Sequence, residues 1–201
     1  VTLAFGSVAA YSVISGNTEI LQKIGINLSQ NYEENKQEIV QNDGTHFSYN
    51  GIDCTLDSIS VDSNTLVMEL TLGLDEQITC VNPELAIKDL KIEVSSREEA
   101  IGEYFNRDEK QSSNQQSDGT YKVFKYIALS DPNTLGSNVF EDIFLDEDEK
   151  AKITISFGSL IGNDGVQIME LDEDICKLEF ELNKTDAIKS GEYFDNGEQM
   201  Q

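Results

Sequence analysis

The chain has one histidine and three cysteines with which to do nucleophilic or metal chemistry. A catalytic triad needs a nucleophile beside a histidine that a third group orients, and the sequence around His46 shows no recognisable constellation of this kind. Structural zinc sites draw on closely spaced Cys and His ligands, whereas Cys54, Cys80 and Cys176 include no CxxC pair. We therefore expect no enzyme activity and no catalytic, cofactor-binding or metal-binding residues.

Two of the cysteines fall in apolar positions of alternating segments. Cys54 continues the series of Ile52 and Leu56, and Cys176 begins the series that Leu178 continues. Such cysteines act as small buried hydrophobic residues, or they pair in a disulfide where the compartment is oxidising. Their spacing along the chain does not choose between these readings.

Acidic runs at residues 146–149 and 172–174 raise the question of calcium. Calcium loops separate their ligands and turn the chain with glycine, and neither run has this pattern. Neighbouring carboxylates on a strand also point to opposite faces. We expect both runs to be solvated loops at strand ends, where charge also discourages edge pairing.

The overall charge of the chain argues against partners whose surface is negatively charged. The formal net charge is -24, from 14 Lys+Arg against 38 Asp+Glu. A surface this acidic repels nucleic-acid backbones and anionic membrane faces. The same charge keeps a secreted domain soluble.

The fold class follows from residues 46–74, which form two alternating strands around a tight turn. Leu66, Met68, Leu70, Leu72 and Leu74 fall on every second position, which is the period of a strand with one buried face. In the preceding strand the apolar phase changes near Asp57–Ser58, as it does at a β-bulge. The turn lies at residues 62–64.

Further strands are predicted at residues 121–129, 153–157 and 176–182. Residues 121–129 carry bulky side chains on both faces, which favours a central strand covered on both sides over an exposed aromatic binding face. About eight short strands without a βαβ rhythm predict an all-β fold, an Ig-like antiparallel β-sandwich with a short N-terminal helix. Residues 106–119 contain no apolar residue other than glycine. We therefore expect a mobile hairpin loop that is able to contact a partner.

The terminal segments divide the chain further. Residues 1–16 are uncharged and are either the outer part of a membrane helix or an apolar segment packed on the domain or on another copy. Residues 17–31 place apolar side chains along one face of a helix. We expect a helix here that either covers the core or couples the domain to the membrane. The β-sandwich is expected over 32–184, and 185–201 is a polar tail or linker.

The central hairpin resembles the extracytoplasmic domain of membrane-anchored anti-sigma factors from Gram-positive bacteria, a domain of unknown function. The matching positions are Asn50–Gly51–Ile52, Thr55–Leu56–Asp57, Asp62 and Asn64–Thr65–Leu66. The pairing of the strands near residues 153 and 178 resembles the closing half of the same domain. The family often carries a tryptophan before the final strand, and this chain has none.

The resemblance implies a non-enzymatic sensory or regulatory domain on the extracytoplasmic side of a single-pass membrane protein. Such a domain would bind a protein or envelope ligand, and a sigma factor would bind only through a cytoplasmic segment before the membrane helix. The alternative is an Ig-like adhesion or spacer module of a bacterial surface protein. No nucleic-acid partner is expected on either reading.

Overall fold

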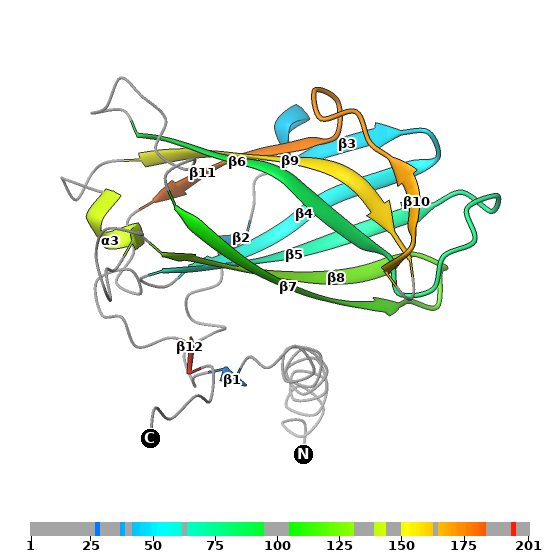
Figure 1. Cartoon of the computed structure of the whole chain (residues 1–201), viewed down its shortest axis with the longest axis horizontal. Coiled ribbons are helices and arrows are strands. Elements are labelled where there is room, and N and C mark those ends of the chain that lie inside the picture. The colour runs from blue at the N-terminus through cyan, green and yellow to red at the C-terminus, as the bar shows by residue number, and fades with distance from the viewer. Residues whose placement is uncertain are drawn as a thin grey trace, which may run out of the picture.

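Two antiparallel sheets packed face to face make up most of the structure (Figure 1). The computed structural model describes residues 27–28, 37–38, 42–61, 64–94, 105–130, 139–143, 150–162, 165–183 and 194–195. The described residues include a 3-10 turn, η1 (Asp43–Thr45), and a short helix, α3 (Val139–Ile143), and are otherwise mostly strand. The predicted all-β sandwich is therefore confirmed.

The larger sheet has six strands in the order β2-β4-β5-β8-β7, with β3 also paired to β4. Their bounds are β2 (Gln37–Glu38), β3 (His46–Tyr49), β4 (Ile52–Val61), β5 (Thr65–Leu74), β7 (Asn106–Gln115) and β8 (Tyr121–Ser130).

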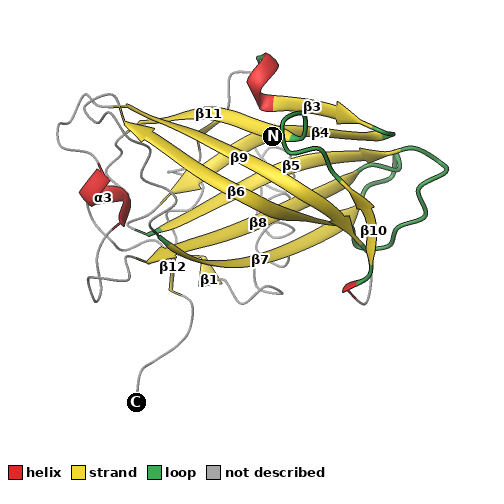
Figure 2. Cartoon of the chain, turned by 45° about the horizontal axis from the view of Figure 1, so that its top comes forward, coloured by secondary structure: helices red, strands yellow, loops and turns green. Residues whose placement is uncertain are grey.

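The smaller sheet has four strands built around the long strand β9 (Lys150–Ile161). Strand β6 (Glu84–Val94) pairs with β9 on one edge. Strands β10 (Gln167–Glu170) and β11 (Lys177–Asn183) pair with successive parts of β9 on the other edge. Figure 2 shows β10 at one end of the sandwich and α3 at the other.

The strand order is that of an immunoglobulin constant-type domain. The order β4-β5-β8-β7 corresponds to strands A-B-E-D of that fold, and β6-β9-β11 corresponds to C-F-G. Strands β2 and β3 extend the first sheet beyond the A position. The Ig-like topology expected from the sequence is thus the observed one.

The β4–β5 hairpin has the predicted bulge. Its pairing register shifts between Leu56 and Ser58, which turns both Asp57 and Ser58 toward the outer face of the sheet. There Ser58 Oγ donates to Glu69 at 3.1 Å, while Lys122 Nζ lies 2.7 Å from Asp57 and 3.2 Å from Glu69. The bulge keeps the apolar series inward and gives its extra polar residue a partner.

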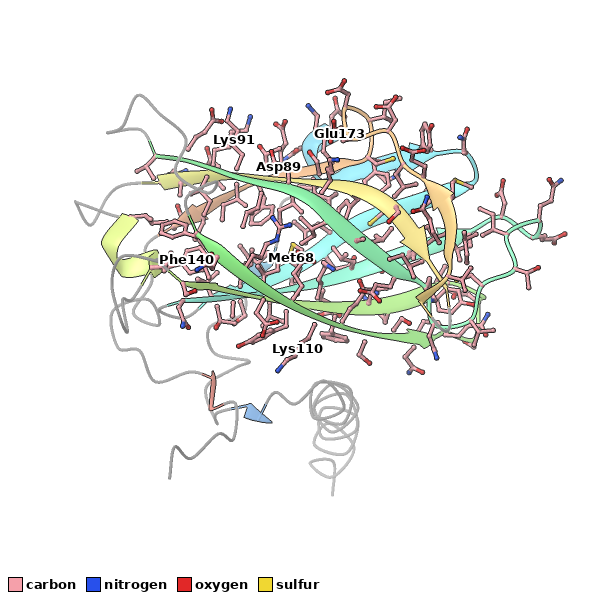
Figure 3. The ribbon with its side chains drawn as sticks, in the orientation of Figure 1. Met68, Asp89, Lys91, Lys110, Phe140 and Glu173 are labelled. Carbon is pink, nitrogen blue, oxygen red and sulfur yellow. The ribbon has the colours of Figure 1, made fainter. Side chains whose placement is uncertain are left out.

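The core lies between the sheets, where the alternating apolar residues of both layers meet. The rings of Phe47 on β3 and Phe157 on β9 lie 5.8 Å apart and join the two layers. Met68 lies in the middle of this core, and Phe140 of α3 closes one end of it (Figure 3). All four side chains are buried.

Strand β8 is covered on both faces, as predicted. Tyr121, Val123 and Ile127 belong to the core between the sheets. Phe124 and Tyr126 point to the opposite face and are buried as well, with 1% and 4% of their surface exposed. The aromatic residues of this strand therefore do not form an open binding face.

The prediction of a mobile loop at residues 106–119 was wrong. Residues 106–115 form β7, which pairs along its length with β8, and only 116–119 form the turn between the two strands. Two polar side chains of β7 bond to β6 and to the residue before it, and others of this strand are exposed. Arg107 donates to the Ile87 carbonyl, and Gln111 bonds to Pro83 and Leu85.

The terminal predictions lie mostly outside the described residues, including the whole of segment 1–16. Within the helix predicted over 17–31, Asn27–Leu28 form strand β1 instead. This strand pairs with β12 (Phe194–Asp195), so the segment 185–201 is not a tail throughout. In the parts of the chain that the structure describes, no helix is long and apolar enough to cross a bilayer.

Candidate functional site

The outer face of the smaller sheet carries a grid of polar side chains, three from each of three neighbouring strands. We call this the charged face. Strand register places Asp89, Ser156 and Lys177 in one row. The next rows are Lys91, Thr154, Glu179 and then Glu93, Lys152, Glu181.

The alternation of each strand builds this face. In β9, Ile153 and Ile155 are fully buried in the core, so the residues between them point outward. The same period holds in β11 around Leu178 and Phe180. Three amphipathic strands in register therefore align their polar positions across the sheet.

Charges of opposite sign are paired on this face. Lys152 Nζ lies 2.8 Å from Glu179, which also lies 3.5 Å from Lys177 Nζ. Lys91 Nζ lies 2.7 Å from Glu93. The hydrogen bond from Lys152 holds the pKa of the Glu179 carboxyl below its ordinary value, and the same bond raises the pKa of Lys152. Both groups are charged at neutral pH.

Loops deepen the charged face into a groove of about 570 Å³. Glu173 and Asp174, from the turn between β10 and β11, stand on one side of it. Lys88 stands on the other side, at an irregularity where β6 shifts register against β9. Figure 3 shows Asp89, Lys91 and Glu173 projecting from this side of the molecule.

Gly158 shapes the wall of the groove at Lys88. A Cβ atom at position 158 would lie 3.2 Å from the Cβ of Lys88, a tight contact that either residue would have to relieve. The glycine therefore lets the lysine side chain lie close over β9.

The charge of the groove differs from that of the whole chain. Four lysines and five acidic side chains line it, for a formal charge of -1, whereas the chain carries -24. A ligand of either sign therefore meets less net repulsion here than over the acidic surface in general. The hydroxyls of Thr154 and Ser156 add donors and acceptors at its centre.

The side chains that line the groove can donate and accept hydrogen bonds, and they carry charges of both signs. Among the described residues that line the groove, none has an aromatic side chain on which a sugar ring or base could stack. Among the described residues, no three His, Cys, Asp or Glu side chains gather as they would around a metal ion. The groove presents an array of positively and negatively charged hydrogen-bonding groups, and the strand register sets the spacing between them.

The histidine lies elsewhere, beside the turn between β3 and β4. His46 Nε2 lies 2.9 Å from Asp53 Oδ1, and Ser48 Oγ donates to the other oxygen of Asp53 at 3.1 Å. Ser48 Oγ is 3.4 Å from the same His46 nitrogen. Sequence reasoning missed this cluster, although residues 46 and 48 share a strand face and a turn at Asn50–Gly51 returns the chain to Asp53.

The geometry of this cluster differs from a catalytic triad. In a triad the acid and the nucleophile contact opposite nitrogens of the imidazole, whereas Asp53 and Ser48 both approach Nε2. The serine hydroxyl donates to the carboxylate of Asp53. The side chains of His46 and Asp53 are also 44% and 62% exposed.

The cysteine and acidic-loop predictions have separate outcomes. Cys54 and Cys176 are fully buried, as the alternation predicted, and both are free thiols. Residues 172–174 form an exposed turn in which Asp172 accepts a hydrogen bond from the amide of Asp174, as expected of a solvated loop. Residues 146–149 lie outside the described ranges.

Comparison with known proteins yields a structural match but no family. No family model matches the chain, and no curated protein matches it. A solved structure described as the conserved domain protein from Bacillus anthracis superposes with a TM-score of 0.49 and 12% sequence identity. The match covers 77% of this chain and 44% of the other, so the chain spans less than half of that protein.

Proposed function

We propose that this chain is the extracytoplasmic sensory or regulatory domain of a membrane-anchored, anti-sigma factor-like protein. On this proposal it acts without catalysis and binds a protein or envelope ligand through the groove on the charged face. Residues 1–16 would attach it to the membrane, and a cytoplasmic segment before them would bind the sigma factor.

One observation carries the binding role, namely the groove of nearly neutral charge on a strongly acidic molecule. Neighbouring strands are about 4.8 Å apart, and alternate residues along a strand are about 6.7 Å apart. The charged face thus presents opposite charges at repeating intervals. A polypeptide or an envelope polymer that carries both charges in an extended conformation matches this pattern.

The regulatory role rests on the resemblance of the central hairpin, whose matching turn is well formed. Asn50 and Gly51 both have positive φ, 46° and 82°, which asparagine and glycine tolerate. The Gly51 carbonyl accepts a hydrogen bond from the Asp75 amide at 2.8 Å. These residues support the fold that the proposal requires, and they assign no ligand.

A transcriptional reporter in a Gram-positive host tests the proposal. The full-length protein is compared with the variant Lys91→Glu/Lys177→Glu, which reverses charge in the groove, and with Lys110→Glu, an exposed control on the other sheet. We expect the groove variant to change reporter output several-fold and the control to leave it unchanged. If deletion of residues 42–183 also leaves the output unchanged, the regulatory role is wrong.

A second candidate is an Ig-like adhesion or spacer module. The observation in its favour is that the charged face already satisfies its own charges, as in the Lys152–Glu179 and Lys91–Glu93 pairs. A face of this kind also keeps a sheet soluble and resists association. An unchanged reporter together with loss of surface attachment in a deletion strain would favour this candidate.

A further inference from the structure

The outer face of the larger sheet has an exposed half and a buried half. Toward the β3–β4 turn its side chains are partly exposed, as at Thr71 and Lys122. Toward the start of β5 they are buried, and Val67, Phe124 and Tyr126 have 1%, 1% and 4% of their surface exposed. The outer face of a two-layer sandwich ordinarily meets water, so a further layer lies over this half.

A buried hydroxyl group indicates the nature of that layer. Strand register places Ser60, Val67 and Tyr126 in one row across β4, β5 and β8. Ser60 is 1% exposed, and its Oγ has no hydrogen-bond partner among the described residues. Water would satisfy this hydroxyl on an open face, so an apolar surface covers the row. We call Ser60, Val67, Phe124 and Tyr126 the covered face.

The short strand β1 lies on this side of the larger sheet. Figures 1 and 2 both place β1 and β12 beyond this sheet, on the side away from the smaller one. Eight residues, 29–36, join β1 to β2, and β2 pairs with Ser58 and Ile59 of β4, directly before Ser60. An extended chain of that length spans about 30 Å at most. Strand β1 is therefore held near the covered face.

The segment before β1 has the pattern that such a cover needs. Within residues 17–26, the aliphatic side chains of Ile20, Leu21 and Ile24 fall on one helical face. A glutamate and a lysine lie among them in the sequence. The segment can therefore present an apolar face to a sheet and a polar face to water.

The other stretches near β1 and β12 fit less well. Residues 29–36 and 184–193, which adjoin these two strands, contain one large aliphatic side chain between them, that of Ile188. Residues 1–16 have no charged side chain with which to face water. Only an amphipathic segment matches a layer that has a sheet on one side and solvent on the other.

We propose that residues 17–26 pack on the covered face and form a third layer over β5 and β8. The aliphatic side chains of this segment contact Val67, Phe124 and Tyr126, and they exclude water from the Ser60 hydroxyl. The contact attaches the larger sheet to the part of the chain that carries residues 1–16. It does not depend on the ligand proposed above.

A photo-cross-link in the full chain identifies the cover. Tyr126→p-azidophenylalanine puts a photoreactive group on the covered face, and mass spectrometry of the digested protein locates the cross-link. We expect a cross-link to residues 17–26. The same replacement at Asn114, an exposed position of this sheet, should give none to that segment.

Other cross-links from position 126 would overturn the proposal. Residues 1–16, residues 184–193 or a second copy of the chain would each be a different cover. Cross-links confined to neighbouring strands of the sheet would likewise show that residues 17–26 do not lie over it.

Thiol labelling tests the same contact through accessibility. Ser60→Cys should react with a maleimide about tenfold more slowly than Asn114→Cys, because only local opening exposes it. Addition of Ile20→Glu/Ile24→Glu should raise the rate at position 60 by about tenfold, because charged side chains do not pack on an apolar face.

A matched pair of substitutions separates packing from charge. Thr18→Glu/Gln22→Glu adds the same charge with the same spacing at polar positions, and it should leave the rate at position 60 unchanged. Cys54, which is fully buried, stays unlabelled while the sandwich is folded. An unchanged rate in the Ile20→Glu/Ile24→Glu chain, with Cys54 still protected, would overturn the proposal. If Cys54 becomes labelled, the cross-link decides.

Discussion

Lys125 is a charged residue in an interior position, and its partners explain why it is tolerated. Its side chain is fully buried, its Nζ donates to the Leu85 carbonyl at 2.8 Å, and Glu109 lies 3.1 Å away. Burial lowers the pKa of this lysine, and the charge of Glu109 opposes that effect. The lysine thus connects β8 to the free edge of β6.

We expect Lys125→Met to lower the free energy of unfolding by about 2–3 kcal/mol, because it leaves the buried Leu85 carbonyl without its donor and removes one of the two cations paired with Glu109, the other being Arg107. Lys110→Met is the matched control, since this lysine is exposed and lies over the Tyr126 ring at 5.8 Å. It should cost at most about 1 kcal/mol. Urea denaturation measures both variants, and equal losses would contradict this account of Lys125.

Glu179 gives the charged face a dependence on pH. Its pKa is lower in the folded chain than its ordinary value of 4.5 because Lys152 donates to it. A lowered acid pKa contributes stability that is present above the ordinary value and is lost as the pH falls through the folded value. We expect Glu179→Gln to cost about 0.5–1 kcal/mol at neutral pH and less near pH 3.

Urea midpoints at both pH values check this expectation. Glu181→Gln is the control, because Glu181 pairs with Lys150 while its side chain remains 63% exposed. Its effect should be close to zero at both pH values. A cost for Glu179→Gln that persists unchanged at low pH would show that packing, and not charge, sets its contribution.

At the scale of elements, β7 shows how a strand without apolar side chains is held in a sandwich. Gln111 donates to the Pro83 carbonyl at 2.8 Å and accepts from the Leu85 amide at 3.2 Å. Arg107 and Lys125 bond to further carbonyls of β6. Side chains from the larger sheet thereby occupy hydrogen-bonding groups on the edge of β6, where another strand could otherwise pair.

We expect Gln111→Ala to lower stability by about 1–3 kcal/mol, because two backbone groups lose their partner. It should also promote association through the uncovered edge of β6, which sedimentation would detect. Asn114→Ala, at an exposed position of the same strand, should change stability by less than about 0.5 kcal/mol. Equal behaviour of the two variants would mean that the β6 edge does not depend on Gln111.

At the scale of the whole molecule, the net charge of -24 opposes compactness. Salt screens repulsion among exposed charges, with a Debye length of about 10 Å at 0.1 M. It also weakens exposed pairs such as Lys150–Glu181, which contribute little. We therefore expect the melting temperature to rise by several degrees between about 0.01 M and 0.5 M sodium chloride. A fall over this range would mean that the ion pairs outweigh the repulsion.

The sequence alone determined the strands whose burial differs between their two faces. Alternation in β4, β5, β9 and β11 predicted which side chains point inward, including Cys54 and Cys176, and a change of phase located the bulge at Asp57–Ser58. Bulk on both faces of β8 predicted burial on both sides. These properties are local, because the period of a strand is set by what covers each of its faces.

The tertiary structure alone decided how strands distant in the sequence share their polar groups. Residues 106–115 have no apolar pattern, so only their pairing with β8 reveals them as a strand. Asp89, Ser156 and Lys177 become one row only once β6, β9 and β11 are neighbours, and His46 meets Asp53 only across the β3–β4 turn. Hydrogen bonds and charge pairs across strands depend on register and strand order, which the period of a single strand does not encode.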